Sequence, residues 1–260
     1  MRNFLILCVF CGIALASFEM HAPNVKFMGR GRWAVADIDE FCENCVVLPY
    51  NKRLEVGSGN FYGISEISQG FCSFALPLKN FSFAMRYSFL KFSNVYREDF
   101  SSFNFSRRIT DKFFTGINLN LYGLRISNFE EGLNRSISST DFDIGFVWRA
   151  KFFALGASLF SANSKEIIFK RISEKNSSQI KAGFVLMPFE KTKMGFDFEK
   201  DGFNAGVETE IAQALKTSFG ISKGNLTFGF SIRLPVLWLN FSTIVNDEIG
   251  NVYFFSMSNE

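Results

Sequence analysis

Few side chains in this 260-residue chain have the types and spacing that catalysis needs. Its single histidine, His21, lies close to the start of the expected mature chain, where it is not expected to be held firmly beside a serine, as a Ser-His-Asp triad requires. The acidic pairs Asp141/Asp143 and Asp197/Glu199 could divide acid and base roles, but a solvated polar wall explains them more simply. The sequence therefore predicts a protein that is not an enzyme and that needs no cofactor.

Cysteine is the other residue type that could carry out redox chemistry or bind a metal. Cys42 and Cys45 have the spacing of a redox motif or of half a zinc site, but no second cysteine pair and no suitable histidine follow, so no metal site is predicted. In an exported protein we expect either a local disulfide between these two or a bridge from one of them to Cys72. Three cysteines remain after the signal, so one thiol would stay unpaired.

The chain begins with MRNFLILCVFCGIALAS, which has the three parts of a secretory signal. Arg2 supplies the positive start, an apolar run extends from Phe4 to Leu15, and Ala14-Leu15-Ala16 provides the small residues of a cleavage site. The apolar run is shorter than the roughly 20 residues that a membrane-spanning helix needs. We therefore expect residues 1–16 to be a cleaved signal peptide and the mature chain to be exported.

The composition favours strands over helices. Phenylalanine contributes 35 residues and proline only 5, while Gly, Ser and Asn recur at short intervals, as is typical of many strands joined by turns. The net charge of +3 is small and spread along the chain, with no cluster of Lys and Arg that would follow a phosphate backbone. Nucleic acid is therefore not an expected partner.

From about residue 53 to residue 258, apolar and polar residues alternate with a period of two. The runs NFSFAMRYSF, DFDIGFVWR, SQIKAGFVL, TKMGFDFEK and NLTFGFSIRL each place aromatic and aliphatic residues on one face and small, polar or charged residues on the other. Turn signals such as Asp201-Gly202 and Lys223-Gly224 separate the runs. Fourteen or fifteen runs predict an all-β antiparallel meander, in which SKEIIFKRI is the weakest run and only DIDEFCENC and VETEIAQALK look briefly helical.

Two architectures use strands of this kind. A soluble β-sandwich buries the apolar face between two sheets, whereas an outer-membrane β-barrel turns it toward lipid and the polar face toward a lumen. The export signal, the persistent pattern and the Phe-rich face favour the barrel, which also leaves no exposed sheet edge. We expect outer-membrane lipid to contact the apolar face and the charged residues of the other face to line the lumen: Asp141, Asp143, Arg149, Lys181, Lys193, Asp197, Glu199 and Glu208.

Two stretches give the chain a resemblance to a known family. MGRGRWAVADIDEF, at residues 28–41, resembles the Met-Gly and Ala-Asp-Asp opening of PorV/PorQ-type outer-membrane proteins, which are relatives of the FadL-like transporters. Residues 193–258 resemble the second half of that family, with its Gly-Val-Glu at Gly206 to Glu208, its Leu-Thr-Phe-Gly-Phe at Leu226 to Phe230, and Ile249-Gly250 before the last strand. The resemblance implies a transmembrane barrel of about fourteen strands, with an N-terminal segment in its lumen or at its periplasmic mouth.

The segment before the first strand lacks the alternation seen afterwards. It is too irregular to face lipid, where each unsatisfied backbone group costs several kcal/mol, so it must lie in the periplasm or inside the barrel. Together with the resemblance, this predicts a plug-like or periplasmic segment at residues 17–52 and a barrel at residues 53–260.

The leading functional hypothesis is a barrel that binds small hydrophobic molecules or passes them across the outer membrane of a Gram-negative-type bacterium, as the resemblance to FadL-like proteins implies. One alternative is an outer-membrane component that assists the secretion or surface attachment of other proteins, as PorV-like members do in type IX systems. The other is a soluble envelope β-sandwich. The partners would be hydrophobic small molecules in the first case and secreted proteins in the second.

Overall fold

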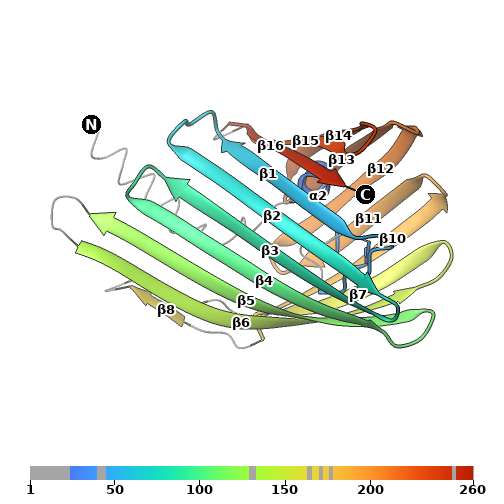
Figure 1. The fold of residues 1–260 in the computed structure, drawn as a ribbon, viewed down its shortest axis with the longest axis horizontal. Coiled ribbons are helices and arrows are strands. Elements are labelled where there is room, and N and C mark those ends of the chain that lie inside the picture. Colours follow the sequence, from blue (N-terminus) through green and yellow to red (C-terminus); the bar gives the residue numbers. More distant parts are fainter. Residues whose placement is uncertain are drawn as a thin grey trace.

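The computed structural model describes residues 24–39, 45–128, 133–162, 166–169, 172–175, 178–247 and 250–259 of the chain. Fourteen strands form one closed antiparallel barrel (Figure 1), which confirms the expected fold class. The strands close on one another instead of forming two packed sheets, so the β-sandwich alternative is wrong. The barrel strands are β1 (Arg53–Phe61), β2 (Ile67–Leu78), β3 (Phe81–Phe92), β4 (Tyr96–Arg108), β5 (Phe113–Asn128), β6 (Leu133–Arg149), β7 (Phe153–Phe160), β10 (Gln179–Phe189), β11 (Thr192–Glu199), β12 (Gly202–Ala212), β13 (Leu215–Ser222), β14 (Asn225–Arg233), β15 (Trp238–Val245) and β16 (Val252–Asn259).

Each wall strand pairs with its neighbours along the chain, except that β7 pairs with β10 and β1 pairs with β16. Between β7 and β10, β8 (Glu166–Phe169) and β9 (Ile172–Lys175) form a separate two-stranded sheet. These two strands contain most of SKEIIFKRI, so the weakest of the runs does form strand but is not part of the wall.

Local helix propensity was misleading at VETEIAQALK, where the structure has no helix. The stretch covers the end of β12, a short turn and the start of β13, with Glu208 opposite Ser218 and Glu210 opposite Lys216. Pairing with two neighbouring strands therefore overrides the helical preference of Glu, Ala, Gln and Leu. DIDEFCENC lies partly outside the described residues. In the described part of the chain, no helix is long and apolar enough to cross a membrane.

The two ends of the barrel differ. At the end where β1 starts, called the short-turn end, strands are joined by tight turns such as Lys79-Asn80 and Glu190-Lys191. At the opposite end β4, β5 and β6, with 13, 16 and 17 residues, project past the other strands (Figure 1). We call this the extended end.

The outer face of the wall is apolar and the inner face is polar. In β14, Phe228, Phe230 and Ile232 are 42–43% exposed, whereas Thr227 and Ser231, at alternate positions, are 0% and 5% exposed. A continuous exposed belt of large apolar side chains is unfavourable against water and favourable against lipid. The strand alternation therefore gives the barrel the surface of a membrane-spanning wall.

We predict that the folded protein migrates faster than the heated protein on a detergent gel, because a closed hydrogen-bonded barrel resists detergent until it is heated. The measurement compares unheated and boiled samples of protein extracted from membranes. Recovery of a monomeric protein that stays soluble without detergent would contradict the membrane assignment.

Candidate functional site

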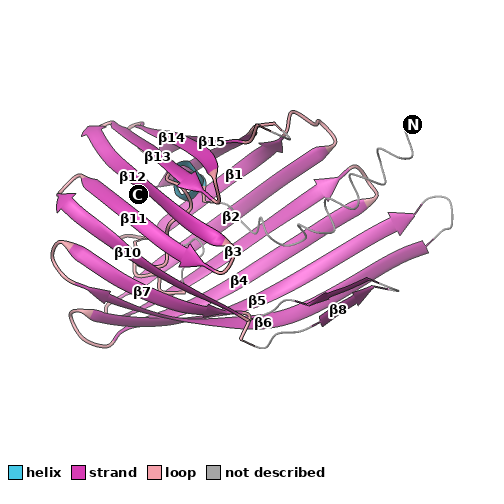
Figure 2. Ribbon diagram, turned by 180° about the vertical axis from the view of Figure 1, so that it is seen from behind, coloured by secondary structure: helices cyan, strands magenta, loops and turns pink. Residues whose placement is uncertain are grey.

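A chain segment that precedes β1 lies against the inner face of the wall. We call residues 24–39 and 45–49 the inner segment. Its side chains are almost all buried, and Val25, Trp33 and Val46 have no exposed surface. Its helix α2 (Val25–Gly29) packs against β13, β14, β15 and β16, and Figure 2 shows it enclosed by the strands. The lumen is therefore occupied along part of its wall.

The start of the inner segment is fixed by a polar cap. The Asn24 side chain accepts a hydrogen bond from the Phe27 backbone N–H at 3.0 Å, as an N-cap residue does. The same side chain donates to Glu55 of β1 at 2.8 Å, and Glu55 also accepts from the hydroxyl of Ser256 in β16 at 2.7 Å. This cap ties α2 to the two strands that close the barrel.

Glycines on the inner wall let the inner segment approach the backbone closely. A Cβ at Gly195 of β11 would overlap the ring of Trp33, and a Cβ at Gly116 of β5 would overlap the carbonyl of Cys45. The inner segment also lies directly against further wall glycines: Gly145, Gly156, Gly206, Gly220 and Gly229. Because only glycine leaves room for such contact, these positions mark the path of the inner segment along the wall.

The middle of the inner segment is held by a wall carboxylate. Asp197 of β11 accepts hydrogen bonds from the backbone N–H groups of Ala34 at 2.5 Å and Val35 at 3.0 Å. The side chain is buried, and charge-assisted bonds of this kind are stronger than neutral ones. Asp197 thus supplies the partners that an irregular buried backbone requires.

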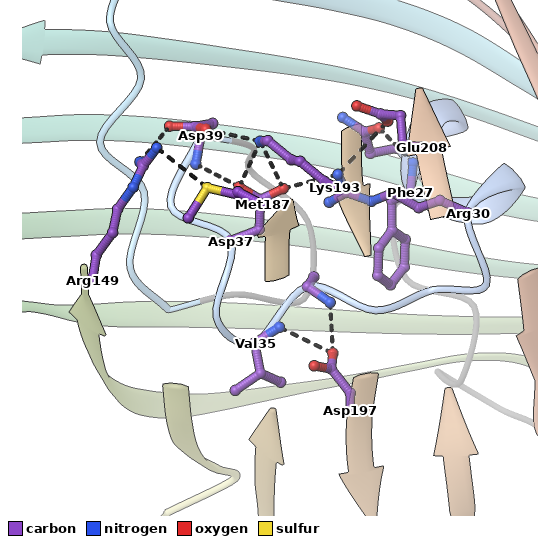
Figure 3. Close-up of polar contacts among 12 residues, drawn as sticks. Phe27, Arg30, Val35, Asp37, Asp39, Arg149, Met187, Lys193, Asp197 and Glu208 are labelled. Atoms are coloured by element: carbon purple, nitrogen blue, oxygen red, sulfur yellow. Dashed lines mark hydrogen bonds and ion pairs between the residues drawn. The ribbon is translucent and has the colours of Figure 1, made fainter. Parts of the chain in front are cut away.

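An ion-pair network joins the inner segment to three wall strands (Figure 3). Lys193 of β11 lies 3.2 Å from Asp37 and 2.8 Å from Asp39, while Arg149 of β6 lies 3.3 Å from Asp39. Arg30 approaches Asp37 at 2.8 Å and stacks over the Trp33 ring at 4.2 Å. Together with Glu208 of β12, which is 3.8 Å from Arg30, we call this network the clamp: Arg30, Asp37, Asp39, Arg149, Lys193 and Glu208.

All eight wall residues singled out from the sequence lie on the inward-facing side of their strands. Four of them, Arg149, Lys193, Asp197 and Glu208, contact the inner segment, as described above. The other four lie elsewhere on the wall. Lys181 pairs with Glu199 at 3.1 Å, Asp143 accepts from Asn120 at 2.7 Å and from the Ser161 backbone at 3.0 Å, and Asp141 is buried on the same face.

The described cysteines lie on opposite sides of the wall. Cys45 is buried in the inner segment, where burial and the nearby Asp143 raise the pKa of its thiol. Cys72 pairs with Val56 on the outer face. Both are free thiols, so the bridge between them is not formed, and Cys42 lies outside the described residues. Among the described residues, no group of three or more His, Cys, Asp or Glu side chains could hold a metal ion.

Beneath the inner segment the inner wall is apolar in two places. Side chains of the inner segment pack on two wall patches that interrupt the Ser- and Asn-rich lining. Val25, Phe27 and Met28 cover the first, and Trp33, Ala36, Ile38 and Val46 cover the second. The first patch consists of Phe61, Phe71, Ile244, Val252 and Phe254, and the second of Phe114, Val147, Ala154 and Val185.

Two cavities open at the short-turn end, and clamp residues line both. The larger, about 680 Å³, is lined by Ile38, Phe114 and Arg149 among others. The smaller, about 290 Å³, is lined by Asp39, Lys193 and Glu208 together with residues around Tyr50. The inner segment thus contributes to the lining of both cavities.

The strand alternation did not identify Arg30 or the wall glycines as part of the site. A signal for the glycines was nevertheless present, because several runs carry a glycine in mid-strand on the inward-facing side, as in DFDIGFVWR, FALGASLF and KMGFDF. A glycine weakens a strand and often marks close approach of another backbone. Its recurrence across neighbouring strands indicates a segment lying across them.

No protein-family model and no curated protein matches the chain. Solved structures match its fold over nearly the whole of each chain. The toluene transporter TbuX of Ralstonia pickettii has a TM-score of 0.63 at 9% identity, covering 94% of this chain and 99% of that one. A mutant of the monoaromatic hydrocarbon channel TodX scores 0.66 at 9% identity, with coverages of 93% and 100%. A FadL homologue of Pseudomonas aeruginosa scores 0.58 at 9% identity, with coverages of 92% and 98%. The chain thus has the fold of FadL-type barrels.

We predict that Gly116→Ala destabilises the protein by about 1–3 kcal/mol, because the new methyl group would overlap the Cys45 carbonyl in a packed interior. Gly123→Ala in the same strand is the control, since a Cβ there meets only ordinary contacts. The measurement is the free energy of unfolding by urea in detergent micelles. Equal values for the two variants would show that the inner segment does not lie against Gly116.

We also predict that Lys193→Gln costs about 1–3 kcal/mol, because the carboxylates of Asp37 and Asp39 lose a partly buried partner. Lys191→Gln removes the pair between Lys191 and Glu210 in the adjacent turn, where the lysine side chain is 55% exposed. This control should cost less than about 1 kcal/mol. Urea unfolding in micelles would distinguish them, and a loss no larger for Lys193→Gln than for Lys191→Gln would contradict the clamp.

Proposed function

We propose that this chain is an outer-membrane barrel that binds small hydrophobic molecules and passes them inward, and that the inner segment closes its path. The observation that carries the proposal is the pair of apolar patches on the inner wall, both covered by the inner segment. Apolar lining with a few placed polar groups is the usual chemistry of a site for a hydrophobic ligand. Displacement of the inner segment would expose that lining to a ligand.

Aromatic side chains also lie on the inner wall nearer the extended end. Phe100 of β4 and Tyr122 of β5 lie with ring centroids 5.2 Å apart on the inner face, and the Arg86 guanidinium lies 5.6 Å from the Phe100 ring. Aromatic rings pack favourably against planar hydrophobic molecules. The solved channels with this fold are described as transporters of toluene and of monoaromatic hydrocarbons, which supports the same ligand class here.

Three further assignments belong to this proposal. Residues 1–16 would be removed on export to the outer membrane. The inner segment, within residues 17–52, would be the plug, and the barrel proper would start with β1 at Arg53. The finer kinship with PorV/PorQ-type proteins, and with it a role in protein secretion, rests on the sequence resemblance alone, so we place hydrophobic uptake first.

A reversible disulfide between the inner segment and the wall tests whether movement of the inner segment opens the path. A Cβ at Gly145 would lie 2.6 Å from the Cβ of Cys45, and a small shift would bring the pair to the roughly 3.8 Å of a disulfide. We predict that Gly145→Cys, when oxidised, loses uptake of a radiolabelled monoaromatic hydrocarbon by cells that express it, and that a reducing agent restores uptake. The unsubstituted protein, given the same oxidant, is the control.

The outcomes separate the two parts of the proposal. Full uptake by the oxidised variant, with the disulfide verified by mass spectrometry, would show that the inner segment does not gate the path. Equal uptake by cells with and without the unsubstituted protein would refute hydrophobic transport itself.

A further inference from the structure

We propose that the outer face of β3, β4 and β5 at the extended end binds the phosphate groups of a phosphorylated glycolipid of the lipid A type in the surrounding leaflet. The proposal rests on the outer-membrane location given above and adds a lipid partner to it. Three cations, Lys91, Arg97 and Arg125, form the surface, which we call the cationic row.

The cationic row crosses three neighbouring strands. Lys91 of β3 is the direct partner of Arg97 of β4, and Arg97 is the direct partner of Arg125 of β5. Directly paired residues project to the same side of a sheet. That side is the outer one, because Phe105 lies on the same face of β4 and Leu121 on the same face of β5, and both are exposed apolar residues.

Such an arrangement is unfavourable without a counterion. Like charges directly opposite each other on neighbouring strands destabilise a sheet. In the described part of the chain the only ion pair of the row is Arg97 with Asp99, at 2.8 Å, and Arg125 lies near enough to interact with the same carboxylate. Among these four residues, three positive charges against one negative charge leave a net charge of about +2, which an external anion would neutralise.

One acid already positions the central arginine. Arg97 donates to Asp99 from both Nε and Nη2, and also to the hydroxyl of Tyr87 at 3.0 Å, while Tyr87 donates to Asp99 at 2.6 Å. The Arg97 guanidinium also lies 5.4 Å from the Phe89 ring. The guanidinium is therefore held in place while 41% of its side chain stays exposed. A preorganised arginine is well suited to a phosphate.

The height of the row along the barrel matches a lipid headgroup. On the outer face of β5, Ile117, Leu119 and Leu121 are exposed apolar residues, and Gly123 and Arg125 follow them. Four residues beyond Leu121 correspond to about 13 Å along a strand, and to about 10 Å along the membrane normal for a strand tilted by about 40°. The outer positions of β6 beside this stretch are also polar: Ser136, Ser138 and Thr140. The row thus lies just past the apolar belt, where headgroups lie.

Phosphate fits the row better than a carboxylate does. A phosphate monoester carries about −1.5 to −2 charges and three acceptor oxygens, so it can meet two or three cations at once. Because the row continues directly from the apolar belt, an anion with acyl chains can place its phosphates on the row and its chains against Leu121 and Phe89. A free phosphate ion would gain only the first of these contacts.

The test measures lipid A binding to the detergent-purified full chain by native mass spectrometry. Lys91→Gln with Arg125→Gln should lower the affinity on the order of tenfold, because two charge-assisted contacts are lost. Arg107→Gln is the matched control: Arg107 lies on the same face of β4 at the short-turn end, 5.2 Å from the Phe81 ring, and its loss should leave binding unchanged. Lys91→Arg with Arg125→Lys keeps both charges and should retain binding.

Three further measurements test whether lost binding in the double Gln variant comes from lost phosphate contacts or from a damaged barrel. Lipid A without its phosphates should bind the unsubstituted protein about as weakly as phosphorylated lipid A binds the double Gln variant. The heat-modifiable band should persist in every variant, which shows that the barrel is intact. In a zwitterionic detergent without lipid A, the double Gln variant should unfold at the same temperature as the unsubstituted protein or at a higher one, because repulsion within the row is relieved.

Equal lipid A affinity in the double Gln variant and the unsubstituted protein would overturn the proposal. So would equal binding of lipid A with and without phosphates, or displacement of the lipid by millimolar inorganic phosphate alone, which would assign the row to a free ion. None of these outcomes would contradict the proposed uptake function, because that function is tested by hydrocarbon uptake and not by lipid binding.

Discussion

Pairing between the first and last strands of the wall is the interaction on which the rest of the structure depends. Eight residue pairs, from Leu54 with Asn259 to Phe61 with Val252, join β1 to β16 and close the ring. Closure gives every wall strand two neighbours, so the wall has no free edge and its backbone groups need no solvent. Once the ring is closed, strand alternation assigns each side chain to one of two environments, the outer surface or the lumen.

Closure also explains how an irregular segment can lie inside. The inner segment forms little regular structure, so wall side chains must satisfy its backbone groups. Asp197 accepts from two of its N–H groups, Thr227 donates to the carbonyl of Gly29 at 3.1 Å, and Asn104 donates to the carbonyl of Cys45 at 2.7 Å. The polar residues that could not face lipid therefore become the hydrogen-bonding partners of the inner segment.

More of the barrel wall than of the candidate site can be predicted from the sequence. Alternation depends only on neighbouring residues, so the barrel and the inward side of residues such as Asp197 can be read along single strands. The clamp pairs Lys193 with Asp37 and Asp39, more than 150 positions earlier, and no local pattern encodes such a contact. The helical expectation for VETEIAQALK is wrong for a related reason. The pairing of β12 with β13 determines the structure of this stretch, and its local helix propensity does not.

Charge is organised differently on the two faces of the wall, and the surroundings explain the difference. Inside the lumen, each cation of the clamp lies within 4 Å of a carboxylate, since a cation that is buried or partly buried needs a counterion that the chain itself supplies. On the outer face at the extended end, Lys91, Arg97 and Arg125 lie side by side, and within the described residues their one ion pair is that of Arg97 with Asp99. A like-charged row is tolerable only where the surroundings supply the anion. The placement of the charges thus indicates which cations the fold neutralises by itself and which it leaves to a partner in the membrane.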